Sequence, residues 1–507
     1  MNVNSKKTSD KEFTQEYIEN QLDKQLTTSL VDNLTMLRKL FSNSSDFITK
    51  RFYIYEKEIM ILYCEGMINL KLLEPLIIEP IYRGHLDNKN SDNLFDWLEA
   101  NIMVTRDNSK LFTYDDIFIS VMSGNVVILI EGEKKALSVE ITGFEFRSID
   151  ESMNEVDIRS PREAFTEPIK INLTMVRRRI KSPVLKFENM MLGKKSKTLV
   201  SLIYLTDVVS KQLIQTIRNR LSKVDIDILL DSSYLSAFLA ERKYSILPEI
   251  SYTERPDVLC GKIGEGRVAI LVDGCPHAII IPHLFVEDFQ KKDDYTNRPV
   301  YASFMRILRF FSFFISILMP GLYVAISSFH PEMFPQTLLF NVALSQEVTP
   351  FPIMVEALFI QFIYELMREA GLRLPRQIGY AVSIVGALVI GESAVSSGII
   401  GAPMVIIVAL TAITSFIMTS MYQSVCILKF VFIILGGLGG LYGITLGMCF
   451  LLLNMCSVNT FNIPYMSPIS PFKAYFMKDT FIRRDWKYLS KTKIKIQDMP
   501  GSGEKIK

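Results

Sequence analysis

The feature that most constrains this chain is the uneven distribution of its charged residues. Between Phe310 and Met455 the sequence contains stretches of about twenty residues almost without charge, the length that an α-helix needs to cross the hydrocarbon core of a bilayer. Residues 1–300 carry Lys, Arg, Asp and Glu throughout. We therefore predict a soluble part followed by a multispanning membrane part, which accounts for a hydrophobic content of 49%.

The N-terminal segment and the overall composition exclude several classes of protein. Residues 1–13 are polar and lack the apolar core and cleavage site of a secretory signal, so we expect the soluble part to be cytosolic. The six cysteines contain no CxxC pair, and we predict neither a disulfide framework nor a metal site. A net charge of +2 does not indicate a nucleic-acid partner.

The soluble part contains an internal repeat. Gly124–Gly132, with the sequence GNVVILIEG, recurs as Gly266–Gly274, GRVAILVDG, at an offset of 142 residues. A weaker echo relates Ile61–Tyr63 to Leu202–Tyr204. Runs rich in Val and Ile that stop at an acidic residue and a glycine predict strands joined by tight turns. We predict a cytosolic α/β domain of two related subdomains, each ending in a hairpin, although two hairpins can also resemble each other by chance.

The same features divide the chain into five predicted parts. These are a polar N-terminal extension (1–45), two soluble α/β subdomains (46–160 and 161–300), a polytopic all-α membrane domain (301–460) and a basic cytoplasmic tail (461–507). Arg306 and Arg309 precede the first apolar stretch, and the tail after Lys473 is basic again. Because basic flanks stay in the cytoplasm, we expect both termini there and an even number of crossings.

Four segments are long and apolar enough to span a bilayer. They are Phe310–Phe329, Ile378–Ile400, Met404–Cys426 and Phe430–Asn454. A fifth stretch, Ile353–Leu366, is shorter and contains acidic residues, and the sequence leaves open whether it crosses. If it does cross, an even number requires one further crossing and the total is six. The glycines of Gly436–Gly440 predict a bend or close packing near the middle of the last helix.

Two groups of residues in the membrane part are candidate functional residues. Small residues recur every three or four positions at Gly379, Ser383, Ala387, Gly391, Ala394 and Gly398. They would share one helix face, which serves either tight helix packing or a narrow pore lining, and their spacing leaves both interpretations open. Acidic residues are costly in lipid and are functional-site candidates by default. The acidic candidates within the apolar segments of the membrane part are Glu356, Glu365 and Glu392.

Three segments of the soluble part have both a ligand-binding and a structural interpretation. Thr253–Asp257 supplies a cap, a proline and an acid for the start of a helix, which we favour over a ligand site. The glycines of Gly261–Gly266 resemble a phosphate loop, but a strand follows where a helix N-terminus is needed. The basic run Arg177–Lys181 is expected on a solvated helix face. No GxxxxGK[ST], HExxH or GxSxG motif is present, and we predict no enzymatic activity.

Several motifs follow one another in a fixed order along the chain. In the soluble part they are Thr253, Glu254, Arg255, Pro256 and Asp257, then Glu265, Gly266 and Arg267, then Asp273 and Gly274 with Cys275 and Pro276. In the membrane part they are Arg368–Gly371, Leu374–Pro375, Ile378–Gly379 and Ile384–Gly391. Taken together, these motifs resemble the A subunit of the GerA family of spore germination receptors. The resemblance runs from about Ser160, where Ser160–Phe165 fits a family pattern, to about Pro471.

The resemblance implies a multi-pass protein of the spore inner membrane that has no enzymatic activity and no cofactor. It implies a transporter-like B subunit and a lipoprotein C subunit as partners, besides membrane lipid. It also implies that the A subunit forms a homo-oligomer and conducts ions when the receptor senses a nutrient, which favours a pore lining for the small-residue stripe. The alternative is a secondary transporter with a cytosolic regulatory domain. Transporters usually show repeated halves with paired broken helices, and the membrane part contains no internal repeat.

Overall fold

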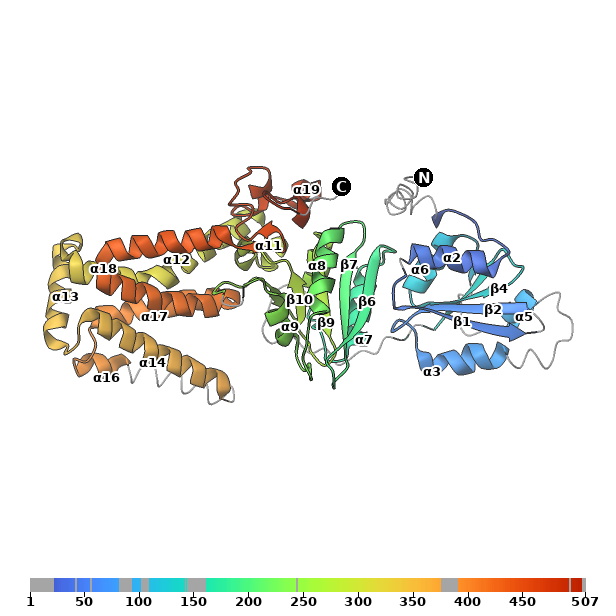
Figure 1. The fold of residues 1–507 in the computed structure, drawn as a ribbon, viewed down its shortest axis with the longest axis horizontal. Coiled ribbons are helices and arrows are strands. Elements are labelled where there is room, and N and C mark those ends of the chain that lie inside the picture. Colours follow the sequence, from blue (N-terminus) through green and yellow to red (C-terminus); the bar gives the residue numbers. More distant parts are fainter. Residues whose placement is uncertain are drawn as a thin grey trace, which may run out of the picture. The chain divides into compact units, whose positions relative to one another are not determined.

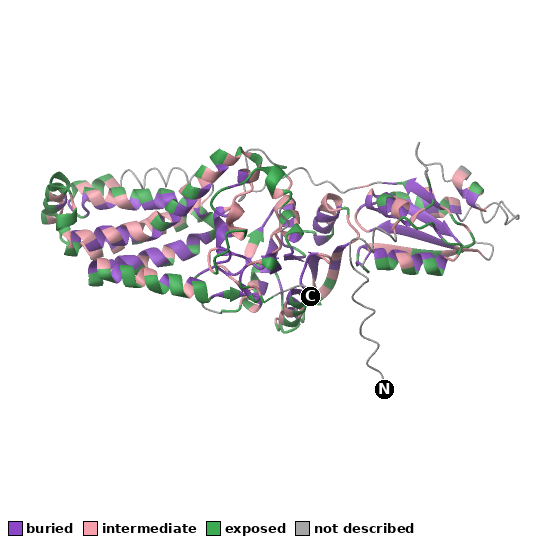
Figure 2. Ribbon diagram, turned by 90° about the horizontal axis from the view of Figure 1, so that it is seen from above, coloured by how far each residue is buried: buried purple, intermediate pink, exposed green. Residues whose placement is uncertain are grey.

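The computed structural model of the chain forms two compact units, drawn in Figure 1 and coloured by burial in Figure 2. The described residues are 22–41, 43–54, 57–81, 94–101, 109–141, 143, 161–242, 245–374, 391–491 and 494–503. The soluble unit contains Met1–Glu241, Ile250–Pro282 and Ile494–Lys507, and the membrane unit contains Arg242–Glu249 and His283–Lys493. Each unit has its own apolar core.

The first sheet of the soluble unit lies between two layers of helices. Its antiparallel strands, in the order β1-β2-β4-β5-β3, are β1 (Phe47–Ile54), β2 (Lys57–Cys64), β3 (Ser109–Leu111), β4 (Asn125–Ile130) and β5 (Ala136–Glu140). The helices are α2 (Leu30–Leu40), α3 (Leu70–Leu73), η1 (Glu74–Ile78), α5 (Leu94–Asn101) and α6 (Tyr114–Met122). In β2, Met60 and Leu62 pack with α2 and α6, whereas Ile59 and Ile61 pack with η1 and α5. Burial on both faces explains why β2 is continuously apolar from Ile59 to Cys64 rather than alternating.

The second sheet has the same antiparallel order, β6-β7-β9-β10-β8. Its strands are β6 (Leu185–Leu192), β7 (Thr198–Leu205), β8 (Ser251–Thr253), β9 (Val268–Val272) and β10 (Ala278–Ile281), and its helices are α7 (Ile169–Arg179), α8 (Lys211–Leu221), α9 (Ser232–Leu239) and α10 (Pro256–Gly264). Helices α7 and α10 share one core with the sheet, in which Val176, Leu259 and Ile203 are fully buried. The predicted α/β fold with two related subdomains is therefore confirmed.

The two subdomains repeat individual hydrogen bonds as well as strand order. The Leu30 amide at the start of α2 donates to Glu131 at 2.8 Å, and the Ile169 amide at the start of α7 donates to Asp273 at 3.0 Å. Both acids stand in the turn between the two strands of the repeated hairpin. The turn glycines Gly132 and Gly274 have φ values of 89° and 85°, a region that side chains other than glycine rarely adopt. The repeat seen in the sequence is thus a repeat of helix caps as well as of strands.

The membrane unit is a bundle of helices with two distinguishable ends. Its helices are α12 (Pro299–Phe329), α13 (Gln336–Val348), α14 (Ile353–Arg373), α16 (Gly391–Ser396), α17 (Ala402–Ile417) and α18 (Tyr422–Ser457), with the shorter η3 (Phe285–Phe289), α11 (Asp293–Thr296), η4 (Pro331–Met333) and η6 (Thr419–Met421). By length and apolar composition, α12 and the helical segment Thr419–Ser457 are candidates to cross a membrane. Helices α13 and α14 are bent by 80° relative to each other, and if the pair counts as one span it is a third candidate. Among the residues that the structure describes, these are the two or three candidate spans of a membrane protein.

Helix α18 reverses its direction at Gly440, where φ is 57° and ψ is −147°. A Cβ on Gly447 would lie 3.1 Å from the Phe432 ring, although these residues would be roughly 22 Å apart in one continuous helix. The Ser424 hydroxyl donates to the Ile246 carbonyl at 2.5 Å, and Arg242 donates to the Ser457 carbonyl at 2.9 Å. The two halves of α18 therefore form an antiparallel hairpin whose ends lie near Arg242–Glu249, which we call the near end of the bundle.

Several predicted spans need correction. The prediction of a single crossing over Phe430–Asn454 is wrong, because the chain turns back at Gly440. The glycine cluster was predicted to cause a bend or close packing, and at Gly440 the helix direction reverses. The predicted span Met404–Cys426 is also wrong at its end, since α17 ends at Ile417 and Tyr422 already begins α18. The predicted helix to Ile400 ends instead at Ser396, because Gly398, with φ of 69°, terminates it.

The structure describes the remaining apolar segments in full or in part. The apolar stretch Phe310–Phe329 lies within α12, and the open segment Ile353–Leu366 is helical as part of α14. Residues 378–390 of the predicted span Ile378–Ile400 lie outside the described residues. Glycines allow α12 and α18 to approach closely, since a Cβ on Gly436 would lie 3.3 Å from the Gly321 Cα atom.

The chain after α18 contributes residues to both compact units. Short elements β11 (Asn459–Thr460), β12 (Ile463–Pro464), η7 (Phe476–Asp479) and α19 (Trp486–Leu489) belong to the membrane unit, and η8 (Ile496–Asp498) belongs to the soluble unit. In the soluble unit the Ile496 amide donates to the Glu265 carbonyl at 2.8 Å, and Ile496 is buried. The C-terminal segment is thus part of the same folded body as the two sheets.

Candidate functional site

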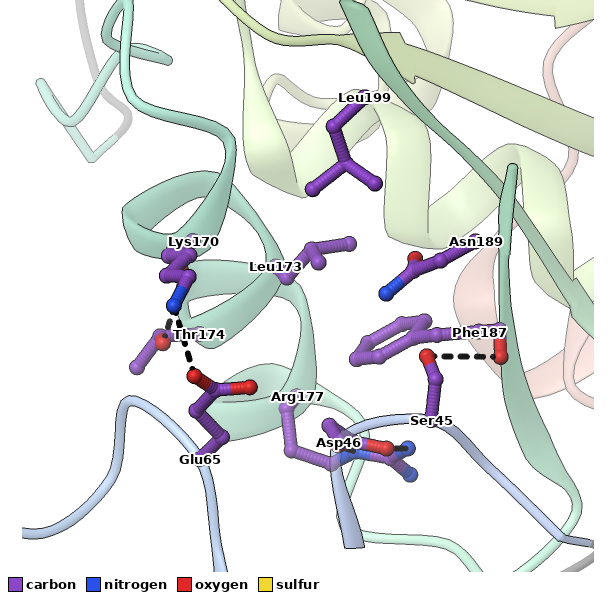
Figure 3. Close-up of a pocket in the computed structure, with 10 residues that line it drawn as sticks. All are labelled: Ser45, Asp46, Glu65, Lys170, Leu173, Thr174, Arg177, Phe187, Asn189 and Leu199. Atoms are coloured by element: carbon purple, nitrogen blue, oxygen red, sulfur yellow. Dashed lines mark hydrogen bonds and ion pairs between the residues drawn. The ribbon is translucent and has the colours of Figure 1, made fainter. Parts of the chain in front are cut away.

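A small pocket lies where the two sheets of the soluble unit contact each other (Figure 3). Its lining residues are Ser45, Asp46, Glu65, Lys170, Leu173, Thr174, Arg177, Phe187, Asn189 and Leu199. The Lys170 ammonium group and the Glu65 carboxylate, from different subdomains, are 2.8 Å apart at the rim. The Ser45 hydroxyl donates to the Phe187 carbonyl at 3.1 Å. A cavity of about 30 Å³ accommodates a water-sized group rather than a large ligand.

Arg177 and Asp46 form a buried ion pair beside this pocket. Arg177 Nε donates to Asp46 Oδ2 at 2.7 Å and Nη2 donates to Oδ1 at 2.8 Å, which is the bidentate geometry that suits a guanidinium group. Burial alone would raise the pKa of Asp46, but the charge and hydrogen bonds of Arg177 outweigh it and lower the pKa. The expectation that Arg177–Lys181 is a solvated face is wrong for Arg177, which is 1% exposed.

The motif Thr253–Asp257 forms the start of helix α10, as favoured from the sequence. Pro256 occupies the first helical turn, and the Arg255 side chain pairs with Asp257, its Nη2 lying 2.9 Å from Oδ2. The predicted cap is wrong in one respect. The N-cap position is Arg255, and the Thr253 hydroxyl accepts a hydrogen bond from the Arg255 amide at 3.1 Å instead of capping the helix.

Glu254 of the same motif contacts His277, which was not predicted as a site residue from the sequence. His277 Nε2 lies 2.9 Å from Glu254 Oε1, and His277 Nδ1 lies 4.0 Å from the buried Cys275 sulfur atom. A contact with Cys275 and the charge of Glu254 raise the pKa of His277 to about 9, despite its partial burial. The spacing of Cys275 and His277, two residues apart in a turn, was the available signal. Within the described residues no group of three or more His, Cys, Asp and Glu residues could hold a metal ion.

Glu265, Gly266 and Arg267 hold the C-terminal segment and the end of the sheet. The Glu265 side chain pairs with Arg267, and Arg267 Nε donates to the Pro282 carbonyl at 3.3 Å. Gly266 has φ of 89°, and a Cβ there would lie 2.8 Å from the Gln497 amide oxygen. Helix α10 ends at Gly264 and β9 begins at Val268, so no helix N-terminus follows these glycines. Asp273 and Gly274 serve the α7 cap described above, and the described motif residues thus have structural contacts.

Glu356 joins two interruptions of the membrane helices. Its carboxylate accepts a hydrogen bond from the Gly401 amide at 2.7 Å, and Glu356 is 4% exposed. Gly401 immediately precedes α17, and Glu356 is in the first turn of α14, so the breaks between α13 and α14 and between α16 and α17 meet. A Cβ on Gly401 would lie 3.2 Å from the Ser345 hydroxyl, which places α13 at the same point.

Glu365 lies in a second polar cluster, between α14 and α18. It accepts hydrogen bonds from Gln361 Nε2 at 2.9 Å and from the Tyr422 hydroxyl at 2.5 Å. The Lys429 ammonium group, which is fully buried, lies 3.9 Å from the same carboxylate. Of these residues only Glu365 was predicted as a candidate from the sequence, and Gln361 and Lys429 were not. A single lysine inside an apolar segment was the signal for Lys429.

The small-residue stripe is only partly described. Gly379, Ser383 and Ala387 lie outside the described residues. Ala394 packs at the margin of an apolar cluster, and Gly398 stands in the turn after α16, so Gly398 does not continue the helix face that its spacing predicted. The remaining two candidates, Gly391 and Glu392, begin α16, where the Glu392 side chain is exposed.

Comparison with known proteins identifies close relatives along most of the chain. Residues 35–494 match the family described as Bacillus/Clostridium GerA spore germination protein. Spore germination protein KA of Bacillus subtilis is 38% identical over 91% of this chain and 85% of its own length. Uncharacterized membrane protein YfkQ of Bacillus subtilis is 36% identical over 92% of this chain and 91% of its own. Spore germination protein GerQA of Bacillus cereus is 34% identical over 89% and 90%, respectively.

One solved structure also matches the soluble part. The N-terminal domain of the A subunit of the Bacillus megaterium spore germinant receptor GerK3 is 30% identical. The match covers 52% of this chain and 98% of that domain, with a TM-score of 0.42.

Proposed function

This chain belongs to the GerA family of spore germination proteins as an A subunit of a spore germination receptor, and we propose that it is the ion-conducting subunit of that receptor. The family is not a family of enzymes. In this proposal the chain acts in the spore inner membrane as a homo-oligomer, together with a transporter-like B subunit and a lipoprotein C subunit. Nutrient binding in the complex shifts the membrane unit from a closed to an open state.

The observation that supports this proposal best is the contact between the two helix interruptions at Glu356 and Gly401. Irregular backbone at membrane depth is tolerated where it is buried in protein or lines a water-filled cavity. Here the hydrogen bond from the Gly401 amide to the Glu356 carboxylate holds the two breaks together at 2.7 Å. In a closed state, the buried Glu356 carboxylate accepts the hydrogen bond of the amide at the start of α17. When the channel opens, the two helix breaks can separate, because water can then bind the polar groups that they expose. A continuous packed helix offers no such polar groups.

The proposed orientation, with both termini in the cytoplasm, has support from the C-terminal segment. Residues Ile494–Lys507 belong to the same compact unit as the two sheets, so both must lie on the same side of a membrane. This requires an even number of crossings. Reporter proteins fused near Asp294 and after Lys507 should therefore both give cytoplasmic signals, and opposite signals would exclude the arrangement.

The decisive experiment measures ion flux and protein level together in the assembled receptor. On the proposed pore-lining face, Ala387→Glu should hydrate a closed constriction and leak ions without nutrient, whereas Ala387→Leu should hinder opening. Ser383→Asp is expected to act like Ala387→Glu. If Ala387→Glu and Ala387→Leu both only deplete the protein, the stripe is a packing surface and the ion path must be sought near Glu356 or Glu392.

Glu356→Gln supplies a second test that does not depend on the stripe. The amide side chain keeps the size of Glu356 and can still accept the Gly401 hydrogen bond, but it removes the charge. We expect normal protein levels with an altered threshold for nutrient-triggered flux. Glu369→Gln, at an exposed position near the other end of α14, is the matched control and should leave flux unchanged.

A further inference from the structure

The segment that follows the helical hairpin, residues 472–491, exposes several large apolar side chains outside the membrane helices. Phe472 is 69% exposed and Trp486 is 56% exposed. The exposed members are Phe472, Tyr475, Phe481, Ile482, Trp486 and Tyr488. We call these side chains, with the basic residues among them, the tail patch. Contiguous exposed aromatic groups on a folded segment indicate a surface that is normally covered.

The tail patch is also strongly basic. Residues 472–491 contain six basic residues and two acidic ones, Asp479 and Asp485. Of the basic residues, Arg483 is buried and does not belong to the surface. The other five are at least partly exposed: Lys473, Lys478, Arg484, Lys487 and Lys491. Asp479 is already paired with Arg306 at 2.8 Å, so it neutralises little of the charge on the surface. The covering partner must therefore be negatively charged as well as able to accept aromatic side chains.

The bases and the aromatic rings of the patch are interleaved. The Lys478 ammonium group lies 4.1 Å from the centre of the Tyr475 ring and 5.1 Å from that of Tyr488. The Arg484 guanidinium carbon lies 5.5 Å from the centre of the Tyr488 ring. Rings and cations are thus presented together, an arrangement that suits a boundary between a charged layer and an apolar one.

Contacts with the start of α12 place the tail patch at such a boundary. The Phe481 and Phe310 ring centres are 4.6 Å apart, and Phe310 begins the apolar stretch of α12. The Arg483 amide donates to the Ser303 hydroxyl at 3.0 Å, two helical turns before Phe310. The Trp486 indole donates to the Tyr295 carbonyl at 3.0 Å. The segment is therefore fixed beside the point where α12 changes from polar to apolar.

We propose that the tail patch binds the anionic headgroups of the membrane leaflet that α12 enters. Tyr and Trp side chains prefer the level of the headgroups. Each Lys or Arg next to a membrane helix raises the affinity for an anionic membrane surface about fivefold. A protein partner would also cover an apolar surface. The continuity of the patch with the apolar part of α12 favours lipid, because the membrane already surrounds that helix. The tail then anchors the membrane unit to a leaflet of defined charge.

Trp486 provides a direct probe, because the chain contains only two tryptophans. The Trp97→Phe variant of the full chain leaves Trp486 as its only tryptophan. We would reconstitute it into vesicles of neutral phosphatidylcholine, or of phosphatidylcholine with one third phosphatidylglycerol, each with and without brominated acyl chains. In anionic vesicles the Trp486 emission should shift to shorter wavelength and be quenched by bromine. In neutral vesicles, or at high salt, both effects should be much weaker.

Charge variants in this background separate lipid binding from mere proximity to the membrane. Lys478→Gln with Arg484→Gln and Lys487→Gln should remove the dependence on anionic lipid. Lys194→Gln with Lys195→Gln and Lys197→Gln, three exposed bases of the soluble unit, is the matched control and should change nothing. Equal emission and quenching in neutral and anionic vesicles, or no quenching in either, would overturn the proposal. Circular dichroism of each variant excludes unfolding as the cause.

Discussion

Arg177 of the second subdomain is paired with Asp46 of the first through two hydrogen bonds, and both side chains are almost fully buried. The Ser44 hydroxyl and the Leu185 carbonyl accept further hydrogen bonds from the same guanidinium group, at 3.0 and 3.1 Å. Phe187 covers it, with the ring centre 4.4 Å from the guanidinium carbon. The contact between the two subdomains therefore centres on one fully satisfied cation.

Removing this cation should destabilise the soluble unit severely. Arg177→Met leaves the Asp46 carboxylate buried without its counter-ion, which typically costs about 3–5 kcal/mol. The midpoint of thermal unfolding, measured on the purified chain, should fall clearly. Arg38→Met is the matched control, because Arg38 occupies the corresponding position in the first subdomain but is exposed, and its effect should stay within about 0.5 kcal/mol. Equal effects of the two substitutions would contradict the special role of Arg177.

Because of His283, the free energy of unfolding should decrease as the pH becomes alkaline. Its Nδ1 and Nε2 atoms lie 3.1 and 3.0 Å from the carboxylates of Glu287 and Asp288, so both ring nitrogens must donate and the imidazole must be protonated. Burial opposes the charge, but Asp288 and Glu287 outweigh it and raise the pKa to about 9.

Since the folded pKa of His283 is raised, its contribution is fully present below about pH 6.5 and is lost as pH rises through about 9. The shift corresponds to about 3 kcal/mol. The unfolding midpoint of the chain should decrease between these pH values, and His283→Gln should flatten that part of the profile. His277→Gln serves as a comparison, because partial exposure should give His277 a smaller effect. A steep profile that persists in His283→Gln would show that another group titrates.

The reversal of α18 should require glycine at position 440. A Cβ there meets the Phe329 ring at 3.1 Å, and φ of 57° with ψ of −147° is unfavourable for any other residue. Gly440→Ala should therefore lower the amount of folded chain in detergent, with a cost of about 1–3 kcal/mol. Gly439→Ala is the matched control, since nothing lies within 4 Å of its Cβ position, and it should be neutral or stabilising. Chromatographic yield and unfolding midpoint are the measurements.

Asp273 should stabilise the start of α7 across the sheet. Asp273→Ala removes the carboxylate that accepts the hydrogen bond of the Ile169 amide, and loss of such a cap costs about 1 kcal/mol. Asp225→Ala removes an exposed carboxylate from a surface ion pair and should have little effect. If the two variants unfold at the same temperature, the turn does not act as a cap.

The soluble fold could be predicted from the sequence because its strands are encoded locally. The paired segments that end in Gly132 and Gly274 specify apolar strands, an acid and a turn within nine residues, and the structure has both hairpins. The Arg177–Asp46 pair could not be found this way, since its partners are 131 residues apart and Arg177 stands in a run that looks solvated.

The membrane unit was harder to predict because the length of an apolar stretch does not show whether the helix continues straight or turns back. A stretch from Phe430 to Asn454 satisfies the length criterion whether it crosses once or turns back at Gly440. Glu356 and Glu365 could be selected as candidates because charge is rare in such segments, and Lys429 carried the same signal. That Gly401 contacts Glu356 and that Lys429 lies near Glu365 follows from tertiary contacts alone.

The acid-to-helix caps of the two subdomains also determine the order in which the chain can become structured during synthesis. The hydrogen bonds of the Leu30 and Ile169 amides cannot form until their acceptor carboxylates, 101 and 104 residues further along the chain, have been synthesised. At roughly 5–20 residues per second a ribosome needs about five to twenty seconds to supply each one. Each subdomain is therefore completed by its own last hairpin, and the first can finish before translation of the membrane helices begins.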